Sequence, residues 1–220
     1  MRAFVAARSR YAEDRFAFAF GRSVRQYVVL GAGLDTFAYR TRFEGVYVFE
    51  LDQPATQVWK RERLVDVGIA IPEHVAYVPI DFERESMLVG LRGAGFDFSA
   101  PVFFAWLGVT PYLTRDAILG TLEVVAQAMQ SGSEVVFDFA ARSSEASDSE
   151  ASQRSLAARV AAIGEPFKSA FDPTAFAADL SALAFSLVEV ADTSILNRCY
   201  FAERADGLCL RGGNMMCVRV

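Results

Sequence analysis

Short apolar runs alternate with longer mixed segments over the first 140 residues of the chain. In each run nearly every position is apolar, and many of the residues are β-branched or aromatic. Continuous apolar runs of this length are typical of strands that are buried on both faces, as in a parallel sheet. The predicted strands are residues 28–30, 45–52, 75–80, 101–106 and 134–139.

The segments between these runs have the spacing of amphipathic helices. Apolar residues recur every three or four positions, as at Ile118, Leu122 and Val125, which is the period of a helix with one buried face. The predicted helices are residues 4–24, 35–40, 54–67, 85–91 and 114–132, and Thr114 is the expected cap of the last one. Strands that alternate with helices favour a parallel sheet with helices on both faces.

The last third of the chain changes character. Residues 142–155 are rich in Ser, Ala, Glu and Asp, which indicates a loop or an exposed helix start. The further predicted elements are helices at residues 156–163 and 172–184 and strands at residues 185–190 and 214–220. Asp172 is the expected cap of the second helix. Two closing strands suggest an antiparallel addition at the sheet edge, which brings the expected sheet to seven strands.

A chain of 220 residues fits a single domain. We expect an N-terminal helix at residues 1–25 that forms a short cover, then the sheet with its helices. Within this one domain, residues 142–184 are expected to form a helical insertion near the substrate pocket.

Composition narrows the classes of function. The net charge is −5 and the isoelectric point is near 5, with no basic run, which argues against nucleic acid or an anionic membrane surface as a partner. No apolar run approaches the roughly 20 residues of a membrane span, and the N-terminus has no signal-peptide core. Cys199, Cys209 and Cys217 share no metal-binding or redox spacing. We therefore expect a cytoplasmic protein whose three thiols lie in the core.

The candidate chemistry lies where the first three strands end. Gly31-Ala32-Gly33 follows the first strand and precedes a predicted helix, and this corner binds nucleotides in open α/β sheets. Glu50 lies roughly 20 residues further on, where an acid meets the hydroxyls of a ribose. Asp81 follows the third strand. Because parallel strands end at the same edge of a sheet, these groups are expected to converge on one ligand.

Several segments, in this order, resemble the leucine carboxyl methyltransferase-like family of S-adenosylmethionine (SAM)-dependent enzymes. They are residues 29–40, 49–54, 59–63, 108–114, 171–173 and 200–208. The similarity runs through nearly the whole chain from Arg8 onward. It implies a class I methyltransferase, Rossmann-like fold and SAM as the methyl donor.

The resemblance also implies the positions of the cofactor contacts. Gly31, Ala32 and Gly33 would lie against the methionine part, Glu50, Leu51 and Asp52 near the ribose, and Asp81 with Phe82 near the adenine. An arginine near the N-terminus holds the SAM carboxylate in this family; the matching stretch contains Arg8 and Arg10, of which we choose Arg10. Tyr112 is the candidate for the substrate pocket.

Two departures from the family pattern stand out. Leu107 occupies the position just before the Gly-Val-Thr segment, where the family usually has an acid near the cofactor's ammonium. Only one predicted helix precedes the first strand, so we expect a pocket that is open or that another chain closes.

The resulting hypothesis is an O-methyltransferase of the EC 2.1.1 class that methylates a carboxylate or phenolic oxygen of a small molecule without a metal. No His/Asp pair is visible, and these oxygens need no strong general base. A non-catalytic SAM-binding protein is one alternative, suggested by Leu107. An NAD(P)-dependent oxidoreductase is another, but its third glycine and its Tyr-x-x-x-Lys pair are missing.

Overall fold

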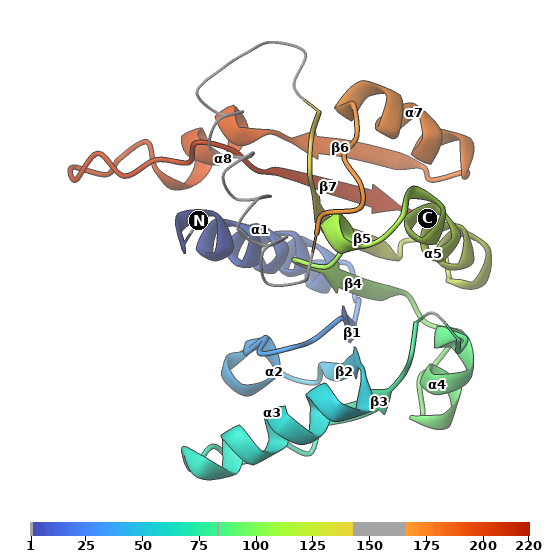
Figure 1. Cartoon of the computed structure of the whole chain (residues 1–220). Coiled ribbons are helices and arrows are strands. Elements are labelled where there is room, and N and C mark those ends of the chain that lie inside the picture. Colours follow the sequence, from blue (N-terminus) through green and yellow to red (C-terminus); the bar gives the residue numbers. More distant parts are fainter. Residues whose placement is uncertain (1, 83, 143–165) are drawn as a thin grey trace.

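Seven strands form one mixed sheet in the computed structural model, which describes residues 2–82, 84–142 and 166–220 (Figure 1). The strand order is β3-β2-β1-β4-β5-β7-β6. β1 to β5 pair in parallel, and β7 is antiparallel to both β5 and β6. The strands are β1 (Gln26–Leu30), β2 (Tyr47–Asp52), β3 (Val75–Pro79), β4 (Val102–Trp106), β5 (Glu134–Phe139), β6 (Leu187–Ala191) and β7 (Asn214–Arg219). The predicted parallel sheet with an antiparallel C-terminal addition is confirmed.

Helices cover both faces of this sheet. One hydrophobic cluster joins α1, α2 and α8 to the face that carries Tyr27 and Val29, and a second joins α4, α5 and α7 to the face that carries Val28 and Leu30. The helices are α1 (Arg2–Gly21), α2 (Phe37–Arg40), α3 (Pro54–Asp66), α4 (Met87–Gly93), α5 (Arg115–Ala128), α7 (Pro173–Ala182) and α8 (Thr193–Tyr200), with a 3₁₀ turn η1 (Thr110–Tyr112).

Polar caps start three of these helices. Thr114 accepts a hydrogen bond from the backbone of Ala117, and Asp172 accepts one from Ala175, so both predicted caps are confirmed. Asp192 caps α8 in the same way, but α8 was not predicted because it spans only eight residues and directly follows a strand. The helix predicted at residues 156–163, and most of the loop predicted at 142–155, lie outside the described residues.

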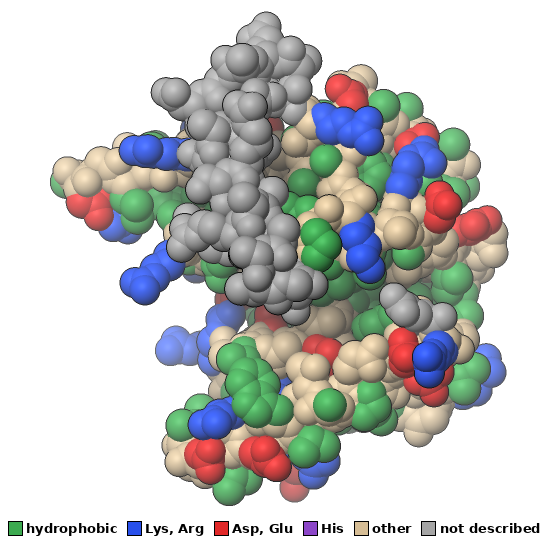
Figure 2. Space-filling view, in the orientation of Figure 1, with side chains coloured by type: hydrophobic (Ala, Val, Ile, Leu, Met, Phe, Trp, Pro, Cys, Tyr) green, Lys and Arg blue, Asp and Glu red, His purple; other side chains and the backbone are tan. Residues whose placement is uncertain are grey.

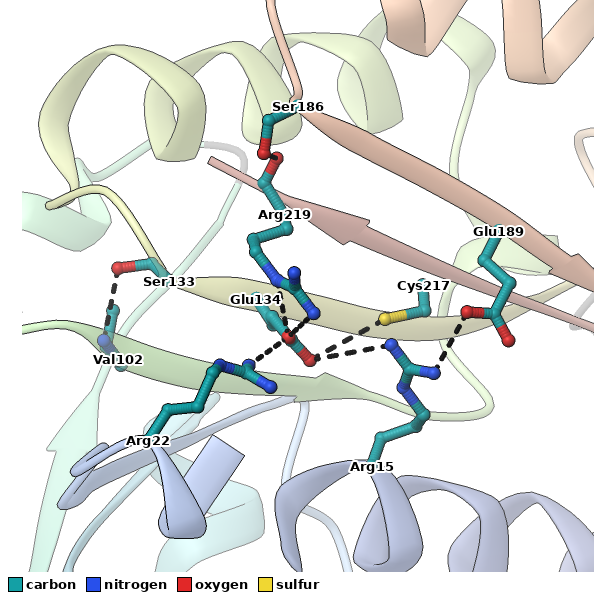
Figure 3. Close-up of polar contacts among 9 residues, drawn as sticks. All are labelled: Arg15, Arg22, Val102, Ser133, Glu134, Ser186, Glu189, Cys217 and Arg219. Atoms are coloured by element: carbon teal, nitrogen blue, oxygen red, sulfur yellow. Dashed lines mark hydrogen bonds and ion pairs between the residues drawn. The ribbon is translucent and has the colours of Figure 1, made fainter. Parts of the chain in front are cut away.

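Helix α1 is tied to the sheet by a buried carboxylate at the start of β5 (Figure 3). The Glu134 side chain is fully buried and accepts hydrogen bonds from Arg22, directly after α1, and from Arg219 of β7, whose Nε lies 2.8 Å away. Arg15 of α1 lies 4.0 Å from the other oxygen and 2.9 Å from Glu189 of β6. Three guanidinium groups thus balance one buried charge and join α1 to β5 and β7.

The cysteines differ from the prediction. Cys217 of β7 is buried, and burial raises the pKa of its thiol to about 12. Cys199 and Cys209 are exposed, so the expectation that all three thiols lie in the core is wrong for these two. Cys199 lies in α8, and Cys209 lies in the segment between α8 and β7. None of the described helices is long and apolar enough to cross a bilayer.

Replacing Glu134 by Ala should lower the free energy of unfolding by about 3 kcal/mol, because it leaves three arginines without their shared buried partner. Chemical denaturation monitored by circular dichroism measures this change. Glu189→Gln is the matched control: it breaks an ion pair of Arg15 in which the glutamate side chain is 44% exposed, and it should cost less than about 1 kcal/mol. Equal losses in the two variants would contradict the anchoring role of Glu134.

Thiol labelling should separate the cysteines. At about pH 8 the folded protein should react rapidly with a disulfide reagent at Cys199 and Cys209 and not at Cys217, because only the thiolate is nucleophilic. All three should react once the chain is unfolded in denaturant. Labelling of Cys217 in the folded state, located by peptide mass spectrometry, would show that β7 is not packed as described.

Candidate functional site

The glycine turn after β1 is hydrogen-bonded to the end of β2. Gly31 has a positive φ of 70°, and the N–H groups of Gly31 and Ala32 both donate to the carbonyl of Leu51, at 2.9 and 3.0 Å. A Cβ at Gly31 would lie 2.5 Å from a methyl carbon of Val109. The turn therefore requires glycine here for its backbone conformation and for the close approach of the loop after β4.

Asp52 holds the second half of this turn. One carboxylate oxygen accepts the N–H of Gly33 at 2.6 Å, and the other accepts the N–H of Gln53 at 2.7 Å. The side chain thus joins the glycine turn to the residue that precedes α3. Because both oxygens already accept backbone hydrogen bonds, Asp52 organises the loops at this edge of the sheet.

Glu50 is the most deeply buried acid at this edge. Its carboxylate is inaccessible to solvent, lies 2.7 Å from Nζ of Lys60 and accepts a hydrogen bond of 3.2 Å from the hydroxyl of Tyr39. Burial raises the pKa of this carboxyl, while the Lys60 ammonium acts in the opposite direction. Both of these contacts use Oε2, and Oε1 has no hydrogen-bond partner among the described residues.

Four elements meet around Glu50: α2 supplies Tyr39, α3 supplies Lys60, and β3 supplies Tyr77, next to the β2 strand that carries the acid. The two tyrosine hydroxyls are 2.5 Å apart, and burial raises the pKa of Tyr39. Gln57 of α3 donates to the backbone carbonyl of Glu50 at 2.8 Å. Two polar side chains of α3, Lys60 and Gln57, therefore face the sheet and contact Glu50.

The outer face of α3 is mixed, with apolar and charged side chains. Val58, Trp59 and Val65 are exposed on the helix beside charged residues such as Arg63 and Asp66, and Figure 2 shows hydrophobic and charged side chains mixed on this part of the surface. The buried face departs from the usual amphipathic pattern, because Gln57 and Lys60 are buried there together with Leu64. This follows from Glu50, since a buried carboxylate needs Lys60 and Gln57 on the side of α3 that faces the sheet.

Asp81 and Phe82 follow β3 at the same edge. Ile80 donates to the carbonyl of Asp52 at 2.9 Å, so the chain stays beside β2 up to the residue before Asp81. The backbone of Asp81 donates to the Glu85 carboxylate at 2.8 Å, and Phe82 packs against the hydrophobic cluster under α4 and α5.

The strand registers show that the predicted groups converge. Leu30 is paired with Leu51, and Asp52 with Pro79. The glycine turn, the two acids of β2 and the start of the segment after β3 therefore lie next to one another at the carboxyl ends of three adjacent strands. The prediction that these groups share one edge is confirmed for their positions; their contacts with a ligand stay predictions.

The two candidate arginines of α1 point in different directions. Arg10 has a side chain that is 67% exposed and pairs with Asp14 one turn along the helix. Arg8 is only 21% exposed and reaches Asp138 at the end of β5, with Nη1 3.0 Å from a carboxylate oxygen. The structure thus brings Arg8, rather than the predicted Arg10, to the carboxyl ends of the strands.

Tyr112 lies in the turn η1 that follows β4. Its ring packs edge-on against Phe167 at 5.3 Å between centroids, and the nearby carbonyl of Pro111 accepts the N–H of Lys168 at 2.7 Å. Tyr112 is half-buried, which is compatible with the wall of a pocket. Leu107, just before this segment, packs against the hydrophobic cluster shared with α1.

Three residues at this edge were not predicted: Lys60, Tyr77 and Asp138. Lys60 lies three residues after Gln57 and four before Leu64, and this helical spacing could have placed it on the buried face. Asp138 is an acid inside an otherwise apolar strand, which is a recognisable signal of a paired or ligand-binding carboxylate. Tyr77 offers no such signal, since tyrosine is common in strands.

The sequence and the fold both match known proteins. The family described as "Leucine carboxyl methyltransferase" matches residues 1–126. A Bacillus subtilis (strain 168) protein named "Putative S-adenosyl-L-methionine-dependent methyltransferase YktD" is 32% identical over 205 residues, covering 92% of this chain and 67% of that protein. A Mycolicibacterium gilvum (strain PYR-GCK) protein named "Putative S-adenosyl-L-methionine-dependent methyltransferase" is 38% identical over 135 residues. This match covers 61% of this chain and 44% of that protein.

A solved structure supports the architecture. The crystal structure titled as a putative methyltransferase from Thermobifida fusca YX superposes with a TM-score of 0.70 at 18% identity, covering 98% of this chain and 80% of that one. At this identity the likeness establishes the fold alone, which is the class I methyltransferase fold. The chain spans two thirds of the Bacillus relative and less than half of the Mycolicibacterium relative. SAM, the cofactor expected from the sequence, is also the one named for these relatives. The family match and the 32% identical relative together show that this chain belongs to the leucine carboxyl methyltransferase family.

Proposed function

We propose that this protein is a SAM-dependent O-methyltransferase that methylates a carboxylate or phenolic oxygen of a small molecule. The observation that carries the proposal is Glu50. This acid is fully buried beside a glycine turn, yet one of its oxygens has no partner among the described residues. An unpartnered buried carboxylate oxygen is costly unless a ligand donates to it, and a ribose hydroxyl is such a donor.

The residues at this edge fit the chemical groups of SAM. Glu50 would accept from the ribose, the turn at Gly31, Ala32 and Gly33 would lie along the methionine part, and Arg8 would bind its carboxylate in place of Arg10. The remaining proposed contacts are Leu51 and Asp52 near the ribose and Asp81 and Phe82 near the adenine. SAM, when bound, supplies a methyl group that a sulfonium already activates.

The protein then contributes by aligning the acceptor oxygen with the methyl group and by excluding water from the site. Holding an acceptor oxygen in line with the methyl group can supply roughly 7–11 kcal/mol of the barrier reduction. Tyr112, half-buried on the turn after β4, is proposed as part of the wall against which the acceptor lies.

The position of the single histidine supports an oxygen acceptor. His74 directly precedes β3, at the amino end of that strand and so at the opposite end of the sheet from Asp81, and its ring nitrogen lies 3.2 Å from the carbonyl of Ala38. A protonated amine needs a base before it can accept a methyl group, whereas a carboxylate carries its lone pair at neutral pH. A site without histidine therefore favours the acidic oxygen.

The experiment that tests this function is methyl transfer from labelled SAM to matched panels of carboxylic acids, phenols and primary amines, with products separated by mass spectrometry. Methyl esters or methyl ethers are expected. Transfer to amines alone would contradict the proposed acceptor class. Failure to bind either SAM or S-adenosylhomocysteine at millimolar concentration would contradict the whole proposal.

The double variant Glu50→Gln/Lys60→Met tests the ribose contact. Because a buried ion pair can often be replaced by uncharged residues without loss of stability, we expect the variant to fold. Its affinity for S-adenosylhomocysteine should fall tenfold or more, since a hydrogen bond to a charged group contributes about 1.5–3 kcal/mol. Isothermal titration calorimetry measures the change.

The control is Asp66→Asn, which removes an exposed charge from the same helix where it pairs with Arg63, and which should leave the affinity unchanged. A folded Glu50→Gln/Lys60→Met variant with wild-type affinity would show that Glu50 does not contact the ligand.

A further inference from the structure

Arg8 is a partly buried cation whose hydrogen-bonding capacity is mostly unused. Among the described residues it donates only to Asp138, through Nη1 at 3.0 Å. A guanidinium carries five N–H donors in one plane, so several remain for another acceptor. Its side chain is 21% exposed, which places the group at the surface of the site.

Asp138 fixes where this guanidinium lies. The Asp138 side chain is only 5% exposed; one oxygen accepts from Arg8 and the other accepts the N–H of Gly108 at 2.5 Å. Burial raises the pKa of this carboxyl, while Arg8 and the N–H of Gly108 act in the opposite direction. Trp106 of β4 is paired with Phe137 of β5, so Asp138 lies across from Leu107. The carboxylate therefore joins α1, the end of β4 and the end of β5 at one point.

Gly108 makes room for Arg8. A Cβ at this position would lie 2.4 to 2.9 Å from the guanidinium atoms, closer than any side chain allows. Gly108 also has a positive φ of 76°. The guanidinium therefore rests directly against the backbone of the loop after β4, with Asp138 behind it.

This loop places Arg8 beside the glycine turn. Val109, the residue after Gly108, is the one whose methyl carbon would be 2.5 Å from a Cβ on Gly31. Gly108 thus contacts Arg8, and the next residue of the same loop, Val109, contacts the glycine turn. A ligand that lies along Gly31 would therefore extend toward Arg8. Its anionic group would lie near the N–H donors of Arg8 that have no partner among the described residues.

We infer that Asp138 is a positioning residue that holds Arg8 over Gly108, so that the guanidinium binds the carboxylate of the cofactor's methionine part. The inference rests on the proposed function. Asp138 acts through Arg8 and does not touch the cofactor. A bidentate arginine–carboxylate contact depends on the orientation of the guanidinium plane, and a buried, doubly bonded carboxylate keeps that plane fixed before the ligand arrives.

The test compares two ligands that differ in the amino-acid chain whose carboxylate Arg8 would bind. S-adenosylhomocysteine carries the α-amino carboxylate; 5′-methylthioadenosine is the same thioether nucleoside without it. In Asp138→Asn the affinity for S-adenosylhomocysteine should fall about tenfold, by analogy with the 10–100-fold effect of removing the partner that orients a metal-binding side chain. The affinity for 5′-methylthioadenosine should stay within about twofold. Calorimetry on the full chain measures both.

A second variant of Asp138 tests whether the loss of affinity comes from the position of Arg8 or from a loss of the fold. Asp138→Glu keeps the negative charge but displaces it by one methylene group, so the guanidinium moves while the ion pair remains. The same selective loss is expected. Glu189→Gln, which breaks another ion pair between α1 and the sheet, should change neither affinity, and thermal unfolding of every variant checks the fold.

The outcomes separate this inference from the proposed function. If the wild-type chain binds neither ligand, the proposed function fails and this inference fails with it. If it binds both and the Asp138 variants weaken both equally, or weaken neither, the proposed function stands and the positioning role of Asp138 is wrong. A selective loss for S-adenosylhomocysteine that disappears in an Arg8→Gln background supports it.

Discussion

The buried carboxylate of Glu50 is the interaction around which this edge of the molecule is built. Removing a carboxylate from water costs several kcal/mol, and the chain offsets this with Lys60 and Tyr39. These partners come from α2 and α3, so the acid also determines which way both helices face. The burial of two polar side chains of α3, Gln57 and Lys60, follows from this one charge.

The two ends of the sheet have different tasks. At the carboxyl ends, the glycine turn, the β2 acids and Arg8 form a polar rim with unused hydrogen-bonding groups. At the amino end of β5, Glu134 is surrounded by three arginines and joins α1 to the antiparallel β7 (Figure 3). The ion pairs of Glu134 therefore join α1 to the sheet at the end that lies away from the candidate site.

Much of the fold could be predicted because the central strands are apolar at nearly every position. The glycine turn was equally clear, since Gly31 must adopt a positive φ. The choice between Arg8 and Arg10 was harder, because both are arginines on one predicted helix. It depends on which face of α1 meets the sheet: Arg8 shares the buried face with Tyr11 and Ala12, and Arg10 does not. Lys60 was missed because a lysine is expected in solvent unless its buried partner is known.

Helix α1 and the turn directly after it contact both ends of a single strand, and this has a consequence for how the protein can vary. Arg22 pairs with Glu134, the first residue of β5, and Arg8 pairs with Asp138, the fifth. Adding or deleting one residue between Arg8 and Arg22 would rotate one arginine by about 100° relative to the other. The spacing of fourteen residues is therefore under tighter constraint than the identity of the residues within it. Divergence in this helix is expected to proceed by substitution and not by changes of length.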